Sequence, residues 1–496
     1  MALPDVTRLS AAAPELLRAF GKHLADIGLT LTAAARATEK AALVAPSLRR
    51  PVRNYHLRRQ PTPVARALRM LVFADPVNDE EARATFGSLL DPLLDAGILV
   101  RRDDGSVVSP FSFALFDDIC MLADDLRLGS DAVMGLGETT ISLCRAALPP
   151  RRVRRALDLG CGAGAVAFAL ARTADHVVAT DINPRAITLA RANAAINGVT
   201  NVELRVGSLF EPVAGETFDL VVSQPPFVSR PSTEGDSSFL FGGRRGDELA
   251  VAVLRGVGDQ LSHPAGRAVM FVEWPEIAGD PLLPRVRDAV GRDDVHVLLL
   301  RAPTVSSELH ASSYAAGLHP HADDAYDRAA SCWLEHLESQ GISGVSPTVT
   351  VVQRAGETPI VSEEIAIRPL STIAVTGQRI DRILAARALL ADEGRLLAAT
   401  LRIPEGTTLS QEQREIGPDA PSTISARFGP EAIVPPIEMS TEMLIVVTMV
   451  HEAPDVRSAV ARFEEAAGVA HDQAFTMCVP AVRSALGHGL LEVRDA

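Results

Sequence analysis

The chain has 496 residues, of which 47% are hydrophobic, 22% are charged and 4% are aromatic, and its formal net charge is −14. The length suggests roughly two to four domains, and the acidic balance argues against sequence-independent nucleic-acid binding, which requires a basic face. The 5 cysteines are scattered without Cys-x-x-Cys spacing, and no apolar run is long enough to cross a bilayer. We therefore expect a cytoplasmic protein with no membrane contact, no disulfide framework and no metal site.

The first segment, residues 1–125, is expected to form a mainly helical domain. Helical apolar spacing from residue 63 onward is followed by a short predicted hairpin around Asp103-Asp104-Gly105. Helices followed by a hairpin are typical of winged-helix modules, which bind DNA or other protein surfaces. In an acidic chain we predict a contact over the substrate mouth, or between the copies of a homodimer, rather than DNA reading.

The middle segment, residues 126–354, alternates strand-like and helix-like stretches. The strand-like runs lie at residues 156–160, 176–181, 202–207, 218–223, 266–274, 295–302 and 349–354. This alternation predicts an α/β fold, Rossmann-like, with a doubly wound and largely parallel sheet that helices cover on both faces. The last segment, residues 355–496, is expected to be a smaller α+β domain, and its closing helices followed by a short strand fit a second winged-helix-like unit.

The first predicted strand of the middle segment ends in a glycine-rich turn, which reads Asp158-Leu159-Gly160-Cys161-Gly162-Ala163-Gly164. Glycines at a strand-to-helix turn let the backbone approach a ligand closely. Asp158 lies two residues before the first glycine and suits a ligand with a cationic amino group, whereas a dinucleotide site usually keeps its first strand apolar. We assign this turn to cofactor binding, through Asp158, Gly160, Cys161, Gly162 and Gly164; the alternative is a plain tight turn.

The second predicted strand ends in an acidic residue, Asp181, which is followed by Ile182 and Asn183. An acidic residue about twenty positions beyond the glycine turn can accept hydrogen bonds from both hydroxyls of a ribose. The alternative is that Asp181 caps the helix that begins at Pro184, although Asn183 is the better candidate for that cap. We assign all three residues to the cofactor site.

The third predicted strand runs into Ser208 and Leu209. Residues leaving this strand would lie against the adenine of a nucleoside-containing cofactor, and Ser208 can donate or accept a hydrogen bond there. The alternative for Leu209 is a place in the core. We predict that both residues contact the cofactor.

The fourth predicted strand ends at Ser223 and runs into Gln224-Pro225-Pro226-Phe227. Ligands of open α/β sheets gather at the carboxyl ends of the strands, so this loop and the three turns above converge on one edge, where Ser223 also falls. A side-chain carbonyl and a backbone carbonyl can accept both N–H hydrogens of a planar amide, and an aromatic ring can stack on it. The two prolines fix φ angles and so preorganise the loop. The alternative is a rigid turn in which Gln224 only satisfies local backbone groups.

Together these motifs resemble the class I S-adenosylmethionine-dependent methyltransferases over about residues 133–354. The resemblance is strongest to the branch of the release-factor glutamine methyltransferases and the small-subunit ribosomal RNA guanine methyltransferases, which carry Asn-Pro-Pro-Tyr/Phe at this loop. It implies S-adenosylmethionine as cofactor and Gln224, Pro225, Pro226 and Phe227 as catalytic residues. It also implies that residues 133–140 cover the methionine end of the cofactor. Gln224 departs from the family residue Asn by one methylene, which opens the identity of the methyl acceptor.

We therefore expect a methyltransferase acting on a nitrogen, with oxygen as the second choice, of a small-molecule or peptide substrate in specialised natural-product biosynthesis. The alternatives are a protein-glutamine or ribosomal RNA methyltransferase and, from another class, an S-adenosylmethionine-sensing regulator with winged-helix modules. Retention of the acceptor loop favours catalysis over sensing, and the net charge weighs against RNA. Four further residues could line the pocket but are more often packing residues: Glu273, Trp274, His310 and Tyr314.

Overall fold

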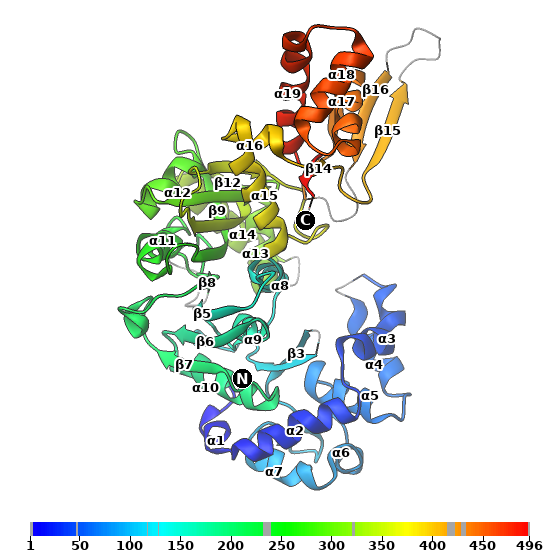
Figure 1. Ribbon diagram of the computed structural model, residues 1–496. Coiled ribbons are helices and arrows are strands. Elements are labelled where there is room, and N and C mark those ends of the chain that lie inside the picture. Colours follow the sequence, from blue (N-terminus) through cyan, green and yellow to red (C-terminus); the bar gives the residue numbers. More distant parts are fainter. Residues whose placement is uncertain are drawn as a thin grey trace.

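The structure, a computed structural model, describes residues 3–45, 48–116, 118–126, 128–231, 240–319, 323–413, 422–427 and 433–494. The chain runs from N-terminal helices through a central sheet to C-terminal helices, and Figure 1 shows the two helical regions at opposite ends of the molecule. Within the described ranges, no helix combines the length and the hydropathy needed to cross a membrane.

The N-terminal region is mainly helical, as predicted. Its helices are α1 (Val6–Ala11), α2 (Pro14–Asp26), α3 (Leu31–Ala42), α4 (Arg49–Leu57), α5 (Pro63–Ala67), η2 (Leu68–Val72), α6 (Asp79–Phe86), η3 (Gly87–Leu89) and α7 (Leu90–Asp95). Side chains explain several helix starts: Thr30 and Thr62 cap α3 and α5, and Asn78 forms a reciprocal capping box with Glu81 in α6. Two antiparallel hairpins follow, formed by β1 (Val100–Arg101) with β2 (Val107–Val108) and by β3 (Ser112–Phe116) with β4 (Ile119–Ala123).

The N-terminal helices pack directly against α10 (Pro184–Ile196), a helix of the central sheet. A Cβ on Gly21 of α2 would lie 1.8 Å from the carbonyl oxygen of Ile196, so this close approach requires glycine. Asn193 of α10 accepts a hydrogen bond from the Leu122 N–H at 2.8 Å and donates one to the Leu122 carbonyl at 2.9 Å, which holds β4. One hydrophobic core therefore runs from the N-terminal helices into the sheet.

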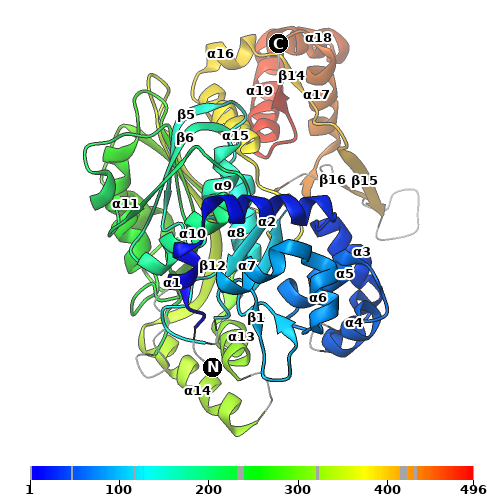
Figure 2. The same cartoon turned by 90° about the horizontal axis from the view of Figure 1, so that it is seen from below.

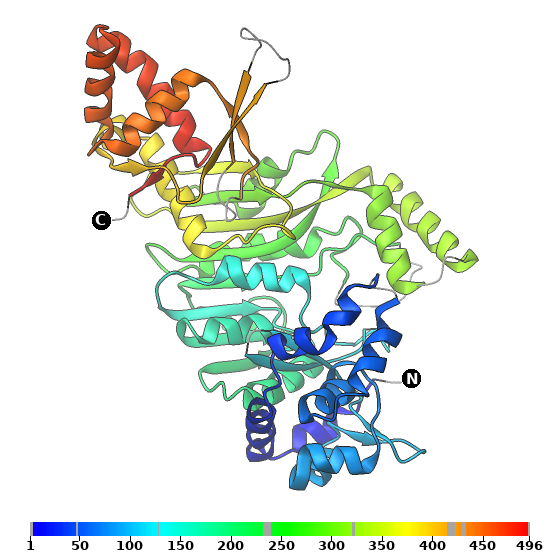
Figure 3. The same ribbon diagram turned by 90° about the vertical axis from the view of Figure 1, so that its right-hand side faces the viewer.

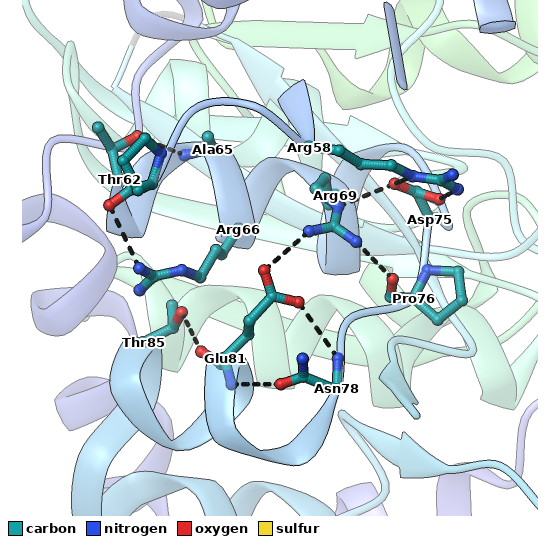
Figure 4. Close-up of polar contacts among 11 residues, drawn as sticks. Arg58, Thr62, Ala65, Arg66, Arg69, Asp75, Pro76, Asn78, Glu81 and Thr85 are labelled. Atoms are coloured by element: carbon teal, nitrogen blue, oxygen red, sulfur yellow. Dashed lines mark hydrogen bonds and ion pairs between the residues drawn. The ribbon is translucent and has the colours of Figure 1, made fainter. Parts of the chain in front are cut away.

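A buried ion network joins the end of α4, η2 and α6 (Figure 4). Asp75 accepts hydrogen bonds from Arg58 and Arg69, and Arg69 also donates to Glu81 and to the Pro76 carbonyl. The side chains of Asp75 and Arg69 are 2% and 9% exposed, so both charges have lost most of their hydration and are stabilised by the ion pair between them. Burial alone would raise the pKa of Asp75, but hydrogen bonds from the two arginines outweigh it and lower the pKa.

Nine strands form the central sheet, in the order β13-β10-β12-β9-β8-β5-β6-β7 with β11 beside β12. They are β5 (Val153–Leu159), β6 (Ala174–Asp181), β7 (Val202–Val206), β8 (Leu220–Ser223), β9 (Arg267–Ile277), β10 (Val295–Arg301), β11 (Val305–Ser306), β12 (Ile342–Arg354) and β13 (Ser362–Ala366). Strands β5 to β9 are parallel, while β12 is antiparallel to β9 and β10, so the sheet is mixed. The predicted α/β fold is confirmed. The sheet extends past residue 354, because β13 pairs with β10, and the division into three domains stays a prediction.

Helices cover both faces of the sheet, as Figure 2 shows. One face carries α8 (Glu138–Ala147), α9 (Ala165–Ala171) and α10, and the other carries α11 (Glu248–Gln260) and α12 (Leu282–Val290). Successive residues of β5 alternate between the two cores: Ala156 belongs to the first and Leu157 to the second. The buried apolar runs predicted from the sequence are therefore strands covered on both faces.

Two further helices, α13 (Ser307–Leu318) and α14 (Asp324–Ser339), lie between β11 and β12. They begin at the carboxyl end of β10, which runs parallel to β9, so they start from the edge where the predicted motifs converge. In Figure 3 this pair (yellow-green) projects to the same side as the N-terminal helices (blue). Both sets of helices are thus placed to border that edge.

The C-terminal region is an α+β unit with a hydrophobic core of its own. Its elements are α15 (Gly377–Leu390), α16 (Glu393–Ala398), β14 (Leu401–Arg402), β15 (Thr408–Gln413), β16 (Ser422–Arg427), β17 (Ile437–Met439), α17 (Thr441–Glu452), α18 (Val456–Ala467), α19 (His471–Gly487) and β18 (Glu492–Val493). β14 pairs with β18, and β15, β16 and β17 form an antiparallel sheet. The start of α15 lies against the end of α8, since a Cβ on Gly377 would lie 2.2 Å from the Leu148 carbonyl oxygen.

Candidate functional site

The predicted cofactor turns lie side by side along the carboxyl edge of the sheet. Leu159 at the end of β5 pairs with Thr180 of β6 on one side and with Ser223 of β8 on the other. Asp181 in turn pairs with Val206 at the end of β7. The chain segments that follow these four parallel strands therefore share one edge, and their individual roles in binding stay predictions.

The glycine turn after β5 is held by the neighbouring strand. The N–H groups of Gly160 and Cys161 both donate to the Thr180 carbonyl at 2.9 Å. Gly160 and Gly162 have φ angles of 80° and 52°, and open space surrounds the position a Cβ would take at Gly160. Glycine is needed there for backbone conformation rather than for lack of room. Burial raises the pKa of the Cys161 thiol well above its ordinary value, so we assign this residue a backbone role only.

Asp158 is the buried acid of the turn. It is 2% exposed, and its Oδ2 has no hydrogen-bond partner within the described part of the chain. Burial raises the pKa of this carboxyl to about 7. Ser223, the other buried polar residue of the adjacent strand end, is satisfied, because its hydroxyl donates to the Leu159 carbonyl at 2.9 Å. An unpartnered carboxyl oxygen beside a backbone turn fits a ligand that brings a cationic amino group.

Asp181 braces the turn rather than capping the next helix. Its Oδ2 accepts a hydrogen bond from the Gly162 N–H at 2.8 Å, and its Oδ1 accepts one from the Asn183 N–H at 2.9 Å. The cap of α10 is Asn183, whose side-chain oxygen accepts from the Arg185 N–H. A carboxylate has about four lone-pair sites, so Asp181 can still accept hydrogen bonds from ribose hydroxyls.

Two large apolar side chains are exposed on the turns beside Asp181. Ile182 is 70% exposed after β6, and Leu209 is 37% exposed after β7, with Ser208 half-buried before it. Leu209 also has a φ of 45°, a conformation that non-glycine residues rarely adopt and that is often found at functional sites. The alternative of a core position for Leu209 is therefore wrong. Exposed apolar side chains on adjacent turns offer a surface for a flat base, so the residues of this edge fit the expected cofactor.

Gln224 is held by the first turn of α8. Its Nε2 donates to the Thr139 hydroxyl at 2.7 Å, and its Oε1 accepts from the Thr140 hydroxyl at 3.1 Å. The amide therefore has a fixed orientation, and its carbonyl oxygen keeps a second lone pair. The sequence assigned residues 133–140 to a cover over the cofactor and gave no sign of this contact with Gln224.

The rest of the acceptor loop packs onto the sheet. Pro225 is buried, while Pro226 and Phe227 are half-buried. The ring of Phe227 lies 5.8 Å from that of Phe271 on β9, at an angle of 60°. The loop is thus anchored at both ends, by α8 and by β9, as a positioning element requires.

Three of the four weaker candidates meet beyond this loop. His310 of α13 lies with its Nδ1 3.9 Å from a carboxyl oxygen of Glu273 on β9. The rings of His310 and Tyr314 are 4.7 Å apart, and Tyr314 stacks on Trp333 of α14 at 5.2 Å. Phe227 and Tyr314 both pack on the small core that contains Trp333. This group, Glu273, His310, Tyr314 and Trp333, is hereafter the aromatic–acid cluster.

In the aromatic–acid cluster His310 and Trp333 are buried, whereas Glu273 and Tyr314 are half-buried. Nε2 of His310 and Nε1 of Trp333 have no hydrogen-bond partner among the described residues. Burial raises the pKa of Glu273 to about 7 and lowers the pKa of His310 to about 4. Near neutral pH the histidine is therefore uncharged and the glutamate titrates, a combination that occurs more often in functional sites than in structural cores.

The fourth weaker candidate, Trp274, belongs to the opposite core. It is fully buried among the residues under α11 and α12, and its Nε1 donates to the Thr350 hydroxyl at 3.2 Å. Strand alternation explains the difference, because adjacent residues of β9 point to opposite faces. Trp274 is therefore a packing residue, and Glu273 shares its face of β9 with Phe271, which packs on Phe227 of the acceptor loop.

Comparisons with known proteins agree with this geometry. Residues 140–238 match the family Methyltransferase small domain. A release factor glutamine methyltransferase from Xylella fastidiosa (strain 9a5c) is 34% identical over 180 residues, which are 32% of this chain and 65% of that protein. A ribosomal protein uL3 glutamine methyltransferase from Xanthomonas campestris pv. campestris is 35% identical over 133 residues, 25% of this chain and 43% of that protein.

Among solved structures, a ribosomal protein L11 methylase from Lactobacillus delbrueckii subsp. bulgaricus aligns with a TM-score of 0.24 and 20% identity, over 33% of this chain and 72% of that one. The chain spans less than two thirds of the length of the two curated relatives. The matched residues lie in the middle segment, where the glycine turn, Asp181 and the acceptor loop lie. Over residues 140–238 the chain therefore matches the methyltransferase small domain of the class I S-adenosylmethionine-dependent methyltransferases, and its middle segment is related to the release factor glutamine methyltransferases.

Proposed function

We propose that this protein transfers the methyl group of S-adenosylmethionine to the side-chain nitrogen of a glutamine in a protein substrate. The observation that carries the proposal is the loop Gln224–Phe227, whose amide Thr139 and Thr140 orient at the edge of the sheet. The two relatives named above are, by name, glutamine methyltransferases of release factors and of ribosomal protein uL3. They support a protein acceptor over the specialised small molecule that the sequence favoured.

The cofactor, when bound, would supply an electrophilic methyl group on a cationic sulfur. Asp158 would hold its amino group, because its buried Oδ2 lacks a partner among the described residues. Asp181 would accept the ribose hydroxyls, and Ile182 and Leu209 would contact the adenine. The backbone of the glycine turn would lie against the methionine portion of the cofactor, close to Ser223, because glycine lets a backbone approach a ligand closely. The residues of this turn are Gly160, Cys161, Gly162 and Gly164.

The acceptor amide has a delocalised lone pair, so its orientation decides the rate. The Gln224 carbonyl and a backbone carbonyl of the Pro-Pro turn would accept its two N–H hydrogens, and Phe227 would stack on its plane. Methylation would form a bond from this nitrogen to the methyl carbon and break the bond from that carbon to the sulfur, with S-adenosylhomocysteine as the leaving group, and the nitrogen would give up one proton. Glu273 lies two residues beyond Phe271, which packs on Phe227, and its pKa is raised to about 7, so we assign it the role of proton acceptor.

The function is tested by incubating the purified protein with labelled S-adenosylmethionine and purified bacterial release factors. We expect label in the release factor, with a single methylated glutamine by peptide mass spectrometry. Ribosomal protein uL3 serves as the second protein acceptor. If neither protein is labelled and small molecules of a cell extract are, the substrate is a small molecule and the proposed protein acceptor is wrong.

The role of Glu273 predicts a pH dependence. A general base works in its deprotonated form, so kcat should rise as pH rises through about 7, roughly tenfold between pH 6 and pH 8. In Glu273→Gln this rise should disappear, and the rate should stay near the wild-type value at low pH. His310 and Tyr314 face the same carboxyl, but neither titrates in this window, because burial lowers the pKa of His310 and raises that of Tyr314.

Glu276→Gln is the matched control, since Glu276 lies on the same strand and forms an ion pair with Arg301 at 2.7 Å, outside the cluster. This variant should keep the wild-type profile. A rise through pH 7 that persists in Glu273→Gln would assign the titration to another group and remove Glu273 from the mechanism.

The flanking regions are proposed as protein-binding elements. The order of η2, a bridge from Val77 to Val107, α6, α7 and the β1–β2 hairpin supports a winged-helix-like module at the N-terminus. The net charge of −14 favours a protein contact, with the substrate or with a second copy of the chain, over nucleic acid. Three domains at residues 1–125, 126–354 and 355–496 remain our proposed division, in which β13 is a strand that the third domain adds to the central sheet.

A further inference from the structure

The C-terminal region lines most of a cavity that shares no lining residue with the predicted cofactor turns or the acceptor loop. Its volume is about 550 Å³, within the range of roughly 300–1,000 Å³ found for small-molecule sites. Its walls come from β13, α15, the β14 strand with the turn after it, and the end of α19 with β18. The cavity thus lies where the edge strand of the central sheet meets the C-terminal unit, and boundaries of this kind often hold ligands.

Arginines dominate the charged part of the lining. Four arginines, Arg379, Arg382, Arg387 and Arg402, face two glutamates, Glu405 and Glu492. Glu363, outside the lining, pairs with Arg387, so these four guanidinium groups meet three carboxylates. The remaining positive charge on a partly enclosed wall favours an anion, because the potential is screened less there than on an open surface.

Carboxylates hold three of these arginines in fixed orientations. Nη1 of Arg382 donates to Glu492 at 3.1 Å, and Nε of Arg402 donates to the other oxygen of Glu492 at 2.9 Å. Arg387 is held by Glu363 on β13 and donates to the Gly487 carbonyl at 3.0 Å. A guanidinium carries five N–H donors, so a contact to Glu492 engages only part of each fork. The arginines are therefore preorganised, and a ligand would not have to pay for ordering them.

The remaining wall is apolar. Ile365 of β13, Ile383 of α15, Val434 and Leu491 line it. An inorganic anion would leave this surface in contact with water, whereas an organic anion would cover it. Carboxylate and phosphate both match the planar fork of arginine.

From these features we infer that the cavity binds a small organic anion, with a carboxylate or phosphate head on the arginines and an apolar body against Ile383 and Val434. This site is separate from the proposed methyl-transfer site and does not depend on that assignment.

Fluorine NMR titration of the full chain tests the inference with three probes: 4-(trifluoromethyl)benzoate, 4-(trifluoromethyl)phenyl phosphate and the neutral 4-(trifluoromethyl)benzyl alcohol. Saturating S-adenosylhomocysteine is present throughout, so that the edge of the sheet is not the site observed. We expect saturable binding of at least one anion with a Kd of about 1 mM, the value typical of a ligand of this size. The alcohol should bind at least about tenfold more weakly. Comparing the affinities of the benzoate and the phenyl phosphate shows whether the site prefers a carboxylate or a phosphate.

Two variants address the site itself. Arg402→Gln removes one donor and should weaken anion binding about tenfold or more. Val434→Glu adds a negative charge to the half-buried wall without removing an ion pair, so it should have the same effect even if Arg402→Gln perturbs the fold. Arg494→Gln is the control, because this exposed arginine lies beside β18 and donates to the His451 carbonyl, away from the lining.

The inference is overturned if neither anion saturates below about 10 mM, or if the alcohol binds as well as the anions. It is also overturned if Val434→Glu and the Arg494 control have equal effects on affinity.

Discussion

Replacing Gln224 with alanine should lower kcat about a hundredfold while leaving the affinity for S-adenosylhomocysteine nearly unchanged. The reason is position: the Gln224 amide is oriented by the hydroxyls of Thr139 and Thr140, whereas the amino group and the ribose of the cofactor are assigned to Asp158 and Asp181. Loss of one positioning contact for the acceptor can reduce the rate by about this factor. Steady-state kinetics and calorimetry on the same preparations separate the two effects.

Gln224→Asn gives a sharper test, because it restores the residue of the resembling branch but retracts the amide by one methylene. The retracted amide cannot keep the hydrogen bonds of 2.7 and 3.1 Å to both threonines without movement of α8. We therefore expect Asn to be slow as well. Thr140→Val is the matched variant on the helix side; it removes the donor to Gln224 Oε1 and should lower kcat less than alanine at 224. Wild-type turnover in Gln224→Ala would show that Gln224 does not position the methyl acceptor and only satisfies local backbone groups.

The parts of the site that could be predicted from the sequence are those encoded locally. Asp181 and the glycine turn follow directly on their strands, and parallel strands place such turns on one edge whatever the rest of the chain does. The strands of the sheet could also be predicted, because each is encoded by a local apolar run. The partners of Gln224 could not be predicted, because Thr139 and Thr140 lie 85 and 84 residues earlier and meet it only through the packing of α8.

The aromatic–acid cluster shows a second limit. Glu273 and Trp274 are neighbours in the sequence and were equal candidates there. The pleat of β9 nevertheless places their side chains on opposite faces of the sheet. The face that borders the acceptor loop is marked only by the packing of Phe227 on Phe271, a contact between the loop and a separate strand. The arginine-lined cavity is less predictable still, since β13, α15, β14 and α19 carry its walls and no local pattern marks them as neighbours.

Asp75→Asn should destabilise the N-terminal region by about 3 kcal/mol. This change keeps the shape of the side chain but leaves Arg69, whose side chain is 9% exposed, without its buried counter-charge. Breaking a buried pair by neutralising one partner costs about 3–5 kcal/mol. The lower end applies here, because Arg69 keeps its contacts with Glu81 and with the Pro76 carbonyl. Hydrogen exchange of the α5 to α7 amides, read by mass spectrometry against denaturant, measures the loss where it occurs.

The same network predicts a pH dependence with a definite sign. The pKa of Asp75 is lowered in the folded protein, so its contribution is complete above the unfolded value of about 3.9 and is lost as pH falls through the folded pKa. Protection of α6 should therefore fall at acid pH in the wild type and show a weaker fall in Asp75→Asn. Asp79→Asn is the control: Asp79 pairs with Arg83 and Arg101 at the surface, where such ion pairs contribute about 0–1 kcal/mol. If Asp79→Asn and Asp75→Asn lowered protection equally, burial of the Arg69–Asp75 pair would not be what stabilises this region.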